Sequence, residues 1–328
     1  MNQTFRAFRI HGDAAGHRSG IEPTTLDALE PGEVDIRVAY SSVNYKDALA
    51  GTGRGRILRR FPLVGGIDVA GHVVASRDAR YREGDAVLVT GSGLSETRDG
   101  GYAEYARLAA DSVIPLPSGL DLREAMILGT AGFTAALALY RMLENGQQPE
   151  HGPLAVTGAT GGVGSLAVDI FSRAGFTVHA ISGKAAHGDY LRQLGATEVL
   201  GREVLSSTRP IETARFGGGL DNAGGAMLAS LLAQTAPYGN VATAGLAASA
   251  DLATTVMPFI IRGVSLLGVA SAGTARDIRE RVWKRLADDW KPVHLDLILT
   301  REVPLEGLAP IFDSMLEGQS LGRTLVVL

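Results

Sequence analysis

The sequence predicts an α/β protein in which a domain of short strands is interrupted by a second domain built on a parallel sheet. In the first third of the chain, short alternating segments are separated by Gly and Pro, which is typical of a β-rich domain. From Pro153 onward, short apolar runs alternate with helical patterns, and this order requires parallel strands joined by helical crossovers. A last strand at residues 324–328 is expected to return to the first domain.

The elements follow from periodicity. In the first part, strands are predicted at residues 34–40, 68–75 and 85–90, and a helix rich in Ala, Leu and Met, interrupted by Gly129 and Gly132, at 122–143. In the second part, strands are predicted at 154–156, 177–182, 198–200, 219–221, 240–246 and 264–270. Helices are predicted between them and after them, at 162–174, 187–194, 226–234 and 276–287, followed by irregular segments.

The composition limits the class of function. With 328 residues, two domains are expected at about 150 residues each. The net charge of −4 and the scattered basic residues argue against a nucleic-acid partner. No apolar run reaches the roughly 18 residues of a membrane span, and the N-terminus lacks the layout of a signal peptide. Since the chain contains no cysteine either, we expect a cytoplasmic protein with no membrane partner.

The sharpest local signal is a glycine loop between a predicted strand and a predicted helix. Ala159, Gly161 and Gly164 form the pattern A-x-G-x-x-G, in which small residues let the backbone approach a diphosphate. The N–H groups and the dipole at the start of the helix favour that anion. The loop therefore predicts a Rossmann-type dinucleotide site, and the alternative is a tight turn without a ligand.

The end of the second strand indicates which dinucleotide binds. NAD-binding sites usually place Asp or Glu there, but this chain has Ser182, Gly183 and Lys184, which suit the 2′-phosphate of NADPH. Tyr190 and Arg202 are candidates for the same pocket. The alternative for each of these side chains is an ordinary solvated residue.

Other chemistries find no support in the sequence. None of the seven histidines forms a His-x-x-x-His pair, and without cysteine a thiolate zinc site is impossible. We find no G-x-S-x-G nucleophile elbow and no phosphate-binding P-loop. Hydrolysis by a nucleophilic side chain and nucleoside triphosphate chemistry are therefore not predicted, and no metal is expected.

Seven segments form a recognisable set, at residues 42–50, 65–71, 129–135, 156–165, 194–196, 255–260 and 322–326. Together they resemble the medium-chain dehydrogenase/reductase superfamily, on its zinc-free quinone-oxidoreductase side, and most closely the YhdH/YhfP branch. The zinc-containing members carry Gly-His-Glu where this chain has Gly66-Ile67-Asp68, and an isoleucine cannot ligate zinc. Ala270 replaces an aspartate common in the branch, and the loop 91–101 also differs, which puts the substrate in doubt.

The resemblance implies a GroES-like β-rich catalytic domain at residues 1–124 and 267–328 and a Rossmann-type NADPH-binding domain at 125–266. It also implies a homodimer formed along the strand at 264–270. The positions that match the cofactor site are Tyr45, Thr160, Gly161, Gly162, Val163, Ser182, Gly183, Lys184, Arg202, Leu246, Ile260 and Ser271. Thr134, in the resembling segment 129–135, and Tyr190, the candidate for the 2′-phosphate pocket, complete the set of predicted cofactor residues.

Two residues are candidates for the chemistry itself. Tyr45 is the candidate proton donor, because a phenol can hydrogen-bond an enolate and return a proton; the alternative is a binding role against the cofactor. Asp68 is expected either to orient a water molecule or to be structural, while Asn44 and Asp47 organise the loop around Tyr45.

Three functions follow from these expectations. The first is NADPH-dependent, metal-free reduction of an activated C=C bond, with acrylyl-CoA converted to propionyl-CoA, as the branch implies. The second is a general NADPH quinone or enone oxidoreductase, which shares the loop but not the substrate. The third is a non-catalytic NADPH-binding sensor.

Overall fold

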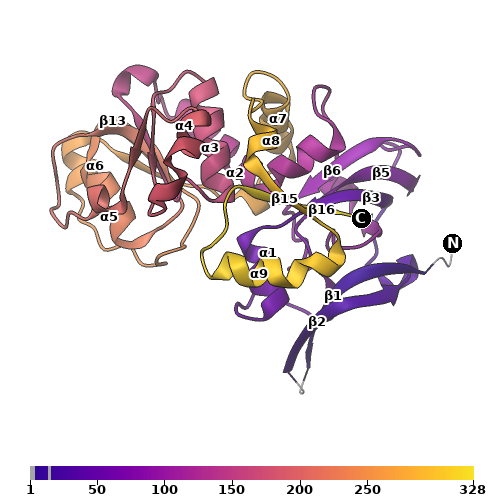
Figure 1. Cartoon of the computed structure of the whole chain (residues 1–328). Helices are drawn as coiled ribbons and strands as arrows, with labels where there is room; N and C mark the ends of the chain where they lie inside the picture. Colours follow the sequence, from indigo (N-terminus) through magenta and orange to yellow (C-terminus); the bar gives the residue numbers. More distant parts are fainter. Residues whose placement is uncertain (1–3, 14–15) are drawn as a thin grey trace. The chain divides into compact units, whose positions relative to one another are not determined.

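The computed structural model describes residues 4–13 and 16–328, and the chain forms two compact units. Unit 1 consists of Met1–Thr130, Ala272–Lys284 and Leu295–Leu328. Unit 2 consists of Ala131–Ser271 and Arg285–His294. Figure 1 follows the succession of helices and strands in sequence colours.

Unit 1 is built on a mixed sheet with the strand order β15-β16-β3-β5-β6-β8, in which β7 also pairs with β3. Its strands are β3 (Val34–Ser42), β5 (Asp68–Ser76), β6 (Ala86–Thr90), β7 (Tyr105–Leu108), β8 (Ile114–Pro115), β15 (Leu299–Val303) and β16 (Arg323–Val327). Val34, Ile36 and Val38 are buried at every second position of β3, because alternate side chains point to opposite faces of a sheet. They form one core with valines of β5 and β6.

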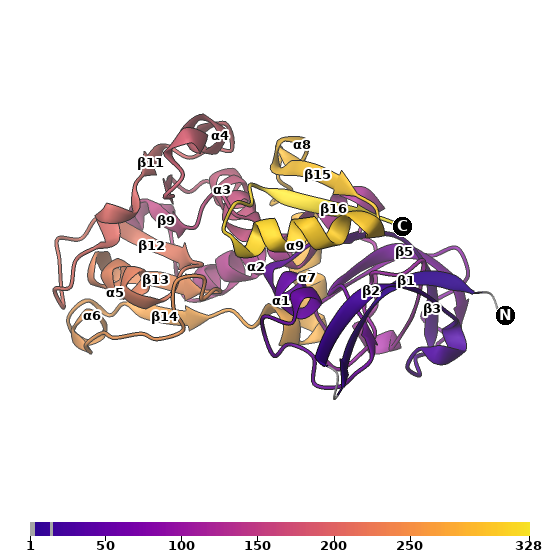
Figure 2. The same cartoon turned by 60° about the horizontal axis from the view of Figure 1, so that its bottom comes forward.

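A second sheet of unit 1 has the order β2-β1-β4, with β1 (Phe5–Asp13), β2 (Gly16–Thr24) and β4 (Leu63–Val64). Its core contains Phe8, Tyr102 and Phe312, whose ring centroids lie 5.8 to 6.3 Å apart. The unit also contains α1 (Tyr45–Thr52), α8 (Leu295–Ile298), α9 (Leu308–Leu316) and α7 (Arg276–Leu286) up to Lys284. Helices α1 and α9 lie side by side (Figures 1 and 2).

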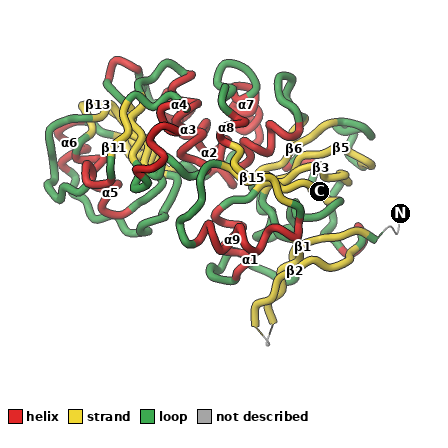
Figure 3. Tube along the Cα trace, viewed as in Figure 1, coloured by secondary structure: helices red, strands yellow, loops and turns green. Residues whose placement is uncertain are grey.

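Unit 2 is a parallel sheet with the order β11-β10-β9-β12-β13-β14. Its strands are β9 (Leu154–Thr157), β10 (Val178–Ile181), β11 (Glu198–Leu200), β12 (Phe216–Asp221), β13 (Thr235–Thr243) and β14 (Ser265–Gly268). Its helices are α3 (Gly162–Arg173), α4 (Gly188–Gln193), α5 (Gly225–Ala233) and α6 (Met257–Arg262). Figure 3 shows the alternation of strand and helix. The strand order reverses between β9 and β12, where parallel α/β sheets bind their ligands.

Most predicted elements are confirmed, with small shifts of their ends. The predicted helix at 122–143 is α2 (Leu122–Glu144), but Gly129 breaks its regular geometry with φ 50° and ψ −154°. The prediction of irregular segments after residue 287 is wrong, because α8, β15 and α9 lie there. Helix α9 contains Pro310 and follows Gly307, both poor helix formers, and it packs Phe312 into the core of unit 1.

Helix α2 is also the one helix of the described residues that is long and apolar enough to cross a membrane. In the most apolar 18-residue stretch of this helix, 78% is buried inside the protein, as in the core helix of a globular domain. The kink at Gly129 divides it into two shorter helical segments.

Candidate functional site

The glycine loop of unit 2 has the geometry of an anion cradle. Gly158 has φ +60°, which favours glycine, and turns the chain from β9 toward α3. A Cβ atom on Gly164 would lie 2.3 Å from the carbonyl oxygen of Gly158 and 2.6 Å from the Cα of Ala159. Gly161 caps α3 without a side-chain hydrogen bond, so the first N–H groups of the helix remain for a ligand. This cradle fits the diphosphate of a dinucleotide.

The end of β10 gathers positive charge beside this loop. The Oγ of Ser182 accepts the backbone N–H of Lys184 at 3.0 Å and lies 3.4 Å from the Oγ1 of Thr160 in the loop. A Cβ on Gly183 would meet the Nε of Arg202 at 2.5 Å, so the guanidinium lies directly against this glycine.

The positive charge of Arg202 also acts on the ammonium group of Lys184. Partial burial and the positive charge of Arg202 lower the pKa of Lys184. Two cations held near each other favour an anion between them, and a phosphate monoester supplies up to two negative charges. The structure thus brings together Thr160, Ser182, Gly183, Lys184 and Arg202 of the predicted set.

The remaining predicted residues of unit 2 fall into three environments. Thr134 donates a 2.9 Å hydrogen bond to the Oγ of Ser271, which joins two predicted positions that are 137 residues apart. Leu246 is 62% exposed and Ile260 is 74% exposed, so both offer apolar surface. The hydroxyl of Tyr190 is buried with no hydrogen-bond partner among the described residues, and burial is the main cause that raises its pKa to about 12.

Sequence reasoning missed two polar residues at the point where the strand order reverses. Asp221 ends β12 and accepts the Oγ1 hydroxyl of Thr157 at 2.8 Å and the N–H of Gly224 at 2.6 Å. Asn222 donates from its side chain to the carbonyl of Thr157 at 2.8 Å. Burial raises the pKa of Asp221. Polar residues directly after a buried parallel strand were the signal available in the sequence.

In unit 1, Tyr45 is the first residue of α1, and its side chain is 46% exposed. Asn44 caps the helix, and its backbone N–H donates to the carboxylate of Asp47 at 2.9 Å. The other Asp47 oxygen accepts the N–H of Ile67 at 3.0 Å. Tyr45 is thus partly exposed, while Asn44 and Asp47 beside it are held by hydrogen bonds. The predicted role of Asn44 and Asp47 in organising this loop agrees with these contacts.

Asp68 has a different environment from Tyr45, because it is completely buried. Its carboxylate accepts hydrogen bonds from Ser42, from the Asn44 side chain and from Thr130. Of the two roles weighed for Asp68, this geometry favours the structural one over the orientation of a water molecule.

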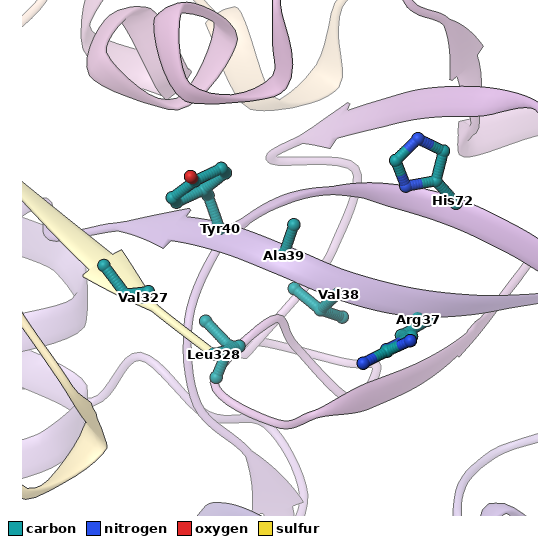
Figure 4. Close-up of a pocket in the computed structure, with 7 residues that line it drawn as sticks. All are labelled: Arg37, Val38, Ala39, Tyr40, His72, Val327 and Leu328. Atoms are coloured by element: carbon teal, nitrogen blue, oxygen red, sulfur yellow. The ribbon is translucent and has the colours of Figure 1, made fainter.

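The described part of the chain contains no group of three or more His, Asp or Glu side chains that could hold a metal ion. A cavity of unit 1 lies between β3, β5 and the C-terminal residues (Figure 4). Another cavity, in unit 2, lies near Glu203 and Gln234. Neither includes a predicted site residue. The cavity of Figure 4 is lined by Arg37, Val38, Ala39, Tyr40, His72, Val327 and Leu328.

Comparison with known proteins agrees with this geometry. The alcohol dehydrogenase GroES-like domain matches residues 30–118, and the zinc-binding dehydrogenase family matches residues 162–288. The acrylyl-CoA reductase AcuI of Ruegeria pomeroyi is 43% identical over 311 residues, which cover 94% of each chain.

Solved structures extend the likeness over the whole chain. The YhdH oxidoreductase of Salmonella enterica, in complex with NADP, has a TM-score of 0.95 and 41% identity, covering 98% of this chain and 99% of that one. The YhfP protein of Bacillus subtilis, with NAD bound, has a TM-score of 0.96 and 43% identity, covering 99% and 100%. Because both family models match and relatives at 41–43% identity cover nearly the whole chain, it belongs to the medium-chain dehydrogenase/reductase superfamily, in the YhdH/YhfP branch, and its lack of cysteine and its Ile67 agree with the zinc-free side of that superfamily.

Proposed function

We propose that this protein uses NADPH to reduce an activated carbon–carbon double bond without a metal, with acrylyl-CoA as the substrate and propionyl-CoA as the product. The observation that carries the cofactor assignment is the pair of cations, Lys184 and Arg202, around Gly183 at the end of β10. The substrate assignment is supported by the likeness to the acrylyl-CoA reductase AcuI.

The glycine loop and the end of β10 would hold the cofactor. The backbone N–H groups of Gly162 and Val163, in the first turn of α3, would bind its diphosphate. Gly161 would contribute through its small size, because its own N–H donates to the carbonyl of Gly158 at 2.9 Å. Ser182, Lys184 and Arg202 would bind the 2′-phosphate. The exposed apolar side chains of Leu246 and Ile260 would cover the apolar faces of the dinucleotide.

When bound, NADPH supplies a hydride to the β-carbon of the substrate, and negative charge then develops on the thioester oxygen. The protein must stabilise this charge and deliver a proton to the α-carbon, which gives the saturated thioester and NADP⁺. The hydroxyl of Tyr45, a residue that is 46% exposed, is the candidate group, because a phenol can donate a hydrogen bond to the enolate and then its proton. The alternative role for Tyr45 is binding of the cofactor.

A steady-state assay tests the proposal. Oxidation of NADPH would be followed with acrylyl-CoA, crotonyl-CoA, a simple quinone and a small enone, and the product would be identified by mass. We expect the highest kcat/KM with acrylyl-CoA. A higher kcat/KM with the quinone would favour a quinone oxidoreductase, the name that a Bacillus subtilis relative carries. Binding of NADPH without turnover of any substrate would favour a sensor.

We also propose the domain division, location and assembly that the sequence predicts. Residues 1–124 and 267–328 would form the catalytic domain, and 125–266 the NADPH-binding domain. Strand β14 is the last strand in its sheet order, so its free edge can pair with a second copy. Tyr238 and Ile261, which are 75% and 60% exposed, add apolar surface in the same unit. Light scattering on the purified protein would test the homodimer, and fractionation of the source cells would test the cytoplasmic location.

A further inference from the structure

The Asp68 carboxylate accepts hydrogen bonds from three residues that lie in two separate segments of unit 1. The Oγ of Ser42 donates to it at 2.5 Å and the side-chain amide of Asn44 at 2.8 Å. Thr130 donates twice, from its backbone N–H at 3.0 Å and from its Oγ1 at 2.6 Å. Asp68 is 0% exposed, so these donors take the place of water around a buried charge.

The first of the two segments, which contains Ser42 and Asn44, leads directly into the candidate proton donor. Asn44 directly precedes Tyr45 at the start of α1, and both the nitrogen and the oxygen of its side-chain amide form hydrogen bonds within the protein. Its Nδ2 donates to Asp68 and also to Asp47 at 3.1 Å, and its Oδ1 accepts from Arg323 at 3.2 Å. The backbone that presents Tyr45 is therefore tied to Asp68 through its neighbour.

The second segment is the kink of α2, where the chain leaves unit 1 after Thr130. Gly129 has φ 50°, and a Cβ at this residue would lie 2.6 Å from both the Oδ2 of Asp68 and the Oγ of Ser42. The kink therefore lies directly against the buried carboxylate. A side chain at residue 129 would displace the groups that bind Asp68.

Arg323 forms hydrogen bonds with the same segments and places a positive charge near the Asp68 carboxylate. Its guanidinium donates to the carbonyl of Ile127 at 2.8 Å, to the carbonyl of Val43 at 2.9 Å and to the Oγ of Ser42 at 2.7 Å. Burial lowers the pKa of Arg323, and the charge of Asp68 opposes that shift. The Tyr45 loop and the α2 kink are thus linked twice, once through Asp68 and once through Arg323.

We propose that Asp68 is a positioning residue: its carboxylate holds the Tyr45 loop and the Gly129–Thr130 kink in one fixed arrangement, so that the Tyr45 hydroxyl is correctly placed for turnover. This inference rests on the proposed function for its kinetic consequence. It does not concern binding of NADPH, because the cofactor residues other than Tyr45 lie in unit 2.

The substitution Asp68→Asn tests this role, because an amide keeps the shape but turns one acceptor into a donor that faces Ser42, Asn44 and Thr130. We expect kcat with acrylyl-CoA to fall by about tenfold or more, while the Kd for NADPH changes by less than about twofold. Hydrogen exchange of the backbone amides of residues 44–47 and of Thr130 should become faster at the same time.

Ser41→Ala is the matched control. The Oγ of Ser41 is also fully buried and donates to the backbone carbonyl of Asp68 at 2.6 Å, so its loss removes a buried hydrogen bond but leaves the carboxylate untouched. We expect this variant to keep kcat within about twofold of the wild type and to leave exchange at residues 44–47 and Thr130 unchanged. Equal losses of kcat in both variants would show a general effect of destabilisation and overturn the proposal.

A second variant keeps the proposal testable if Asp68→Asn does not fold. Thr130→Val removes only the Oγ1 donor and preserves the volume of the side chain, so a smaller fall of kcat and faster exchange at residues 44–47 are expected. Wild-type kcat and wild-type exchange in this variant would contradict the proposal. If the wild-type protein itself reduces no activated alkene, the proposed function fails, whereas the exchange measurements still decide whether Asp68 fixes the Tyr45 loop.

Discussion

The guanidinium of Arg202 lies against Gly183, so closely that a methyl group at residue 183 would come within 2.5 Å of its Nε. Lys184 follows directly, and the charge of Arg202 helps to lower its pKa. The repulsion between these two positive charges raises the electrostatic free energy of the empty site, and a bound phosphate would offset it with negative charge. We infer that this relationship underlies the proposed preference for NADPH over NADH.

Lys184→Glu should therefore reverse the preference between the two cofactors. The carboxylate would repel a 2′-phosphate and could accept hydrogen bonds from the 2′-hydroxyl of NADH. We expect the ratio of kcat/KM for NADPH to that for NADH to fall by about tenfold or more. Arg192→Ala is a suitable control, because Arg192 is an exposed cation of α4 paired with Asp189. Unchanged KM values for both cofactors in the Lys184 variant would refute the assignment of this site.

Gly164→Ala should abolish binding of the dinucleotide. The new methyl group would collide with the backbone of Gly158 and Ala159, which cannot move aside as a flexible side chain can. We expect a loss of about 1–3 kcal/mol in the free energy of unfolding and no saturable binding of NADPH by titration. Gly20→Ala makes the same change where nothing lies within 4 Å, and it should leave both quantities unchanged. Wild-type affinity in the Gly164 variant would show that the loop does not bind a diphosphate.

Tyr45→Phe should lower kcat on acrylyl-CoA by about tenfold or more if the phenol donates the proton. The ring remains, so packing and stacking contacts are retained and KM for NADPH should change little. Tyr238→Phe removes a hydroxyl from another exposed tyrosine and should leave kcat unaffected. Turnover near the wild-type value in the Tyr45 variant would limit Tyr45 to a role in binding.

The fold, and the grouping of the candidate cofactor residues in unit 2, follow largely from local patterns. The glycine loop is recognisable because its geometry depends on residues close in the chain: Gly158 has φ +60°, and a Cβ on Gly164 would collide with the backbone of Gly158 and Ala159. The same holds for Ser182, Gly183 and Lys184, which directly follow a strand.

The buried network around Asp68 could not be predicted from such patterns. Asp68 and Arg323 are linked through Ser42 and Asn44, and these residues come together only when β3, β5 and β16 pair in one sheet. The sequence shows Gly129 as an interruption of a helix. Why a glycine is needed there, namely its close contact with Asp68, depends on the tertiary structure. Sequence patterns therefore report local geometry, whereas long-range polar contacts need the fold.

The last prediction concerns Asp47 and the dependence of stability on pH. Burial, followed by the negative charge of Asp68, raises the pKa of Asp47 from 3.8 to about 7 in the folded protein. Between these two values the folded protein holds a proton on Asp47 that the unfolded chain has released. The contribution of Asp47 to stability is thus fully present below pH of about 4 and is lost as pH rises toward about 7.

Asp47→Asn removes this titration while retaining a side-chain oxygen that can accept the N–H of Asn44. We expect the free energy of unfolding of the variant to fall less steeply than that of the wild type as pH rises from about 4 to about 7. Urea unfolding at several pH values in this window measures the two slopes. Asp313→Asn, at an exposed carboxylate paired with Arg54, is the control and should keep the wild-type slope. Parallel slopes for Asp47→Asn and the wild type would show that Asp47 titrates as it does in the unfolded chain, and that the buried network does not hold its proton.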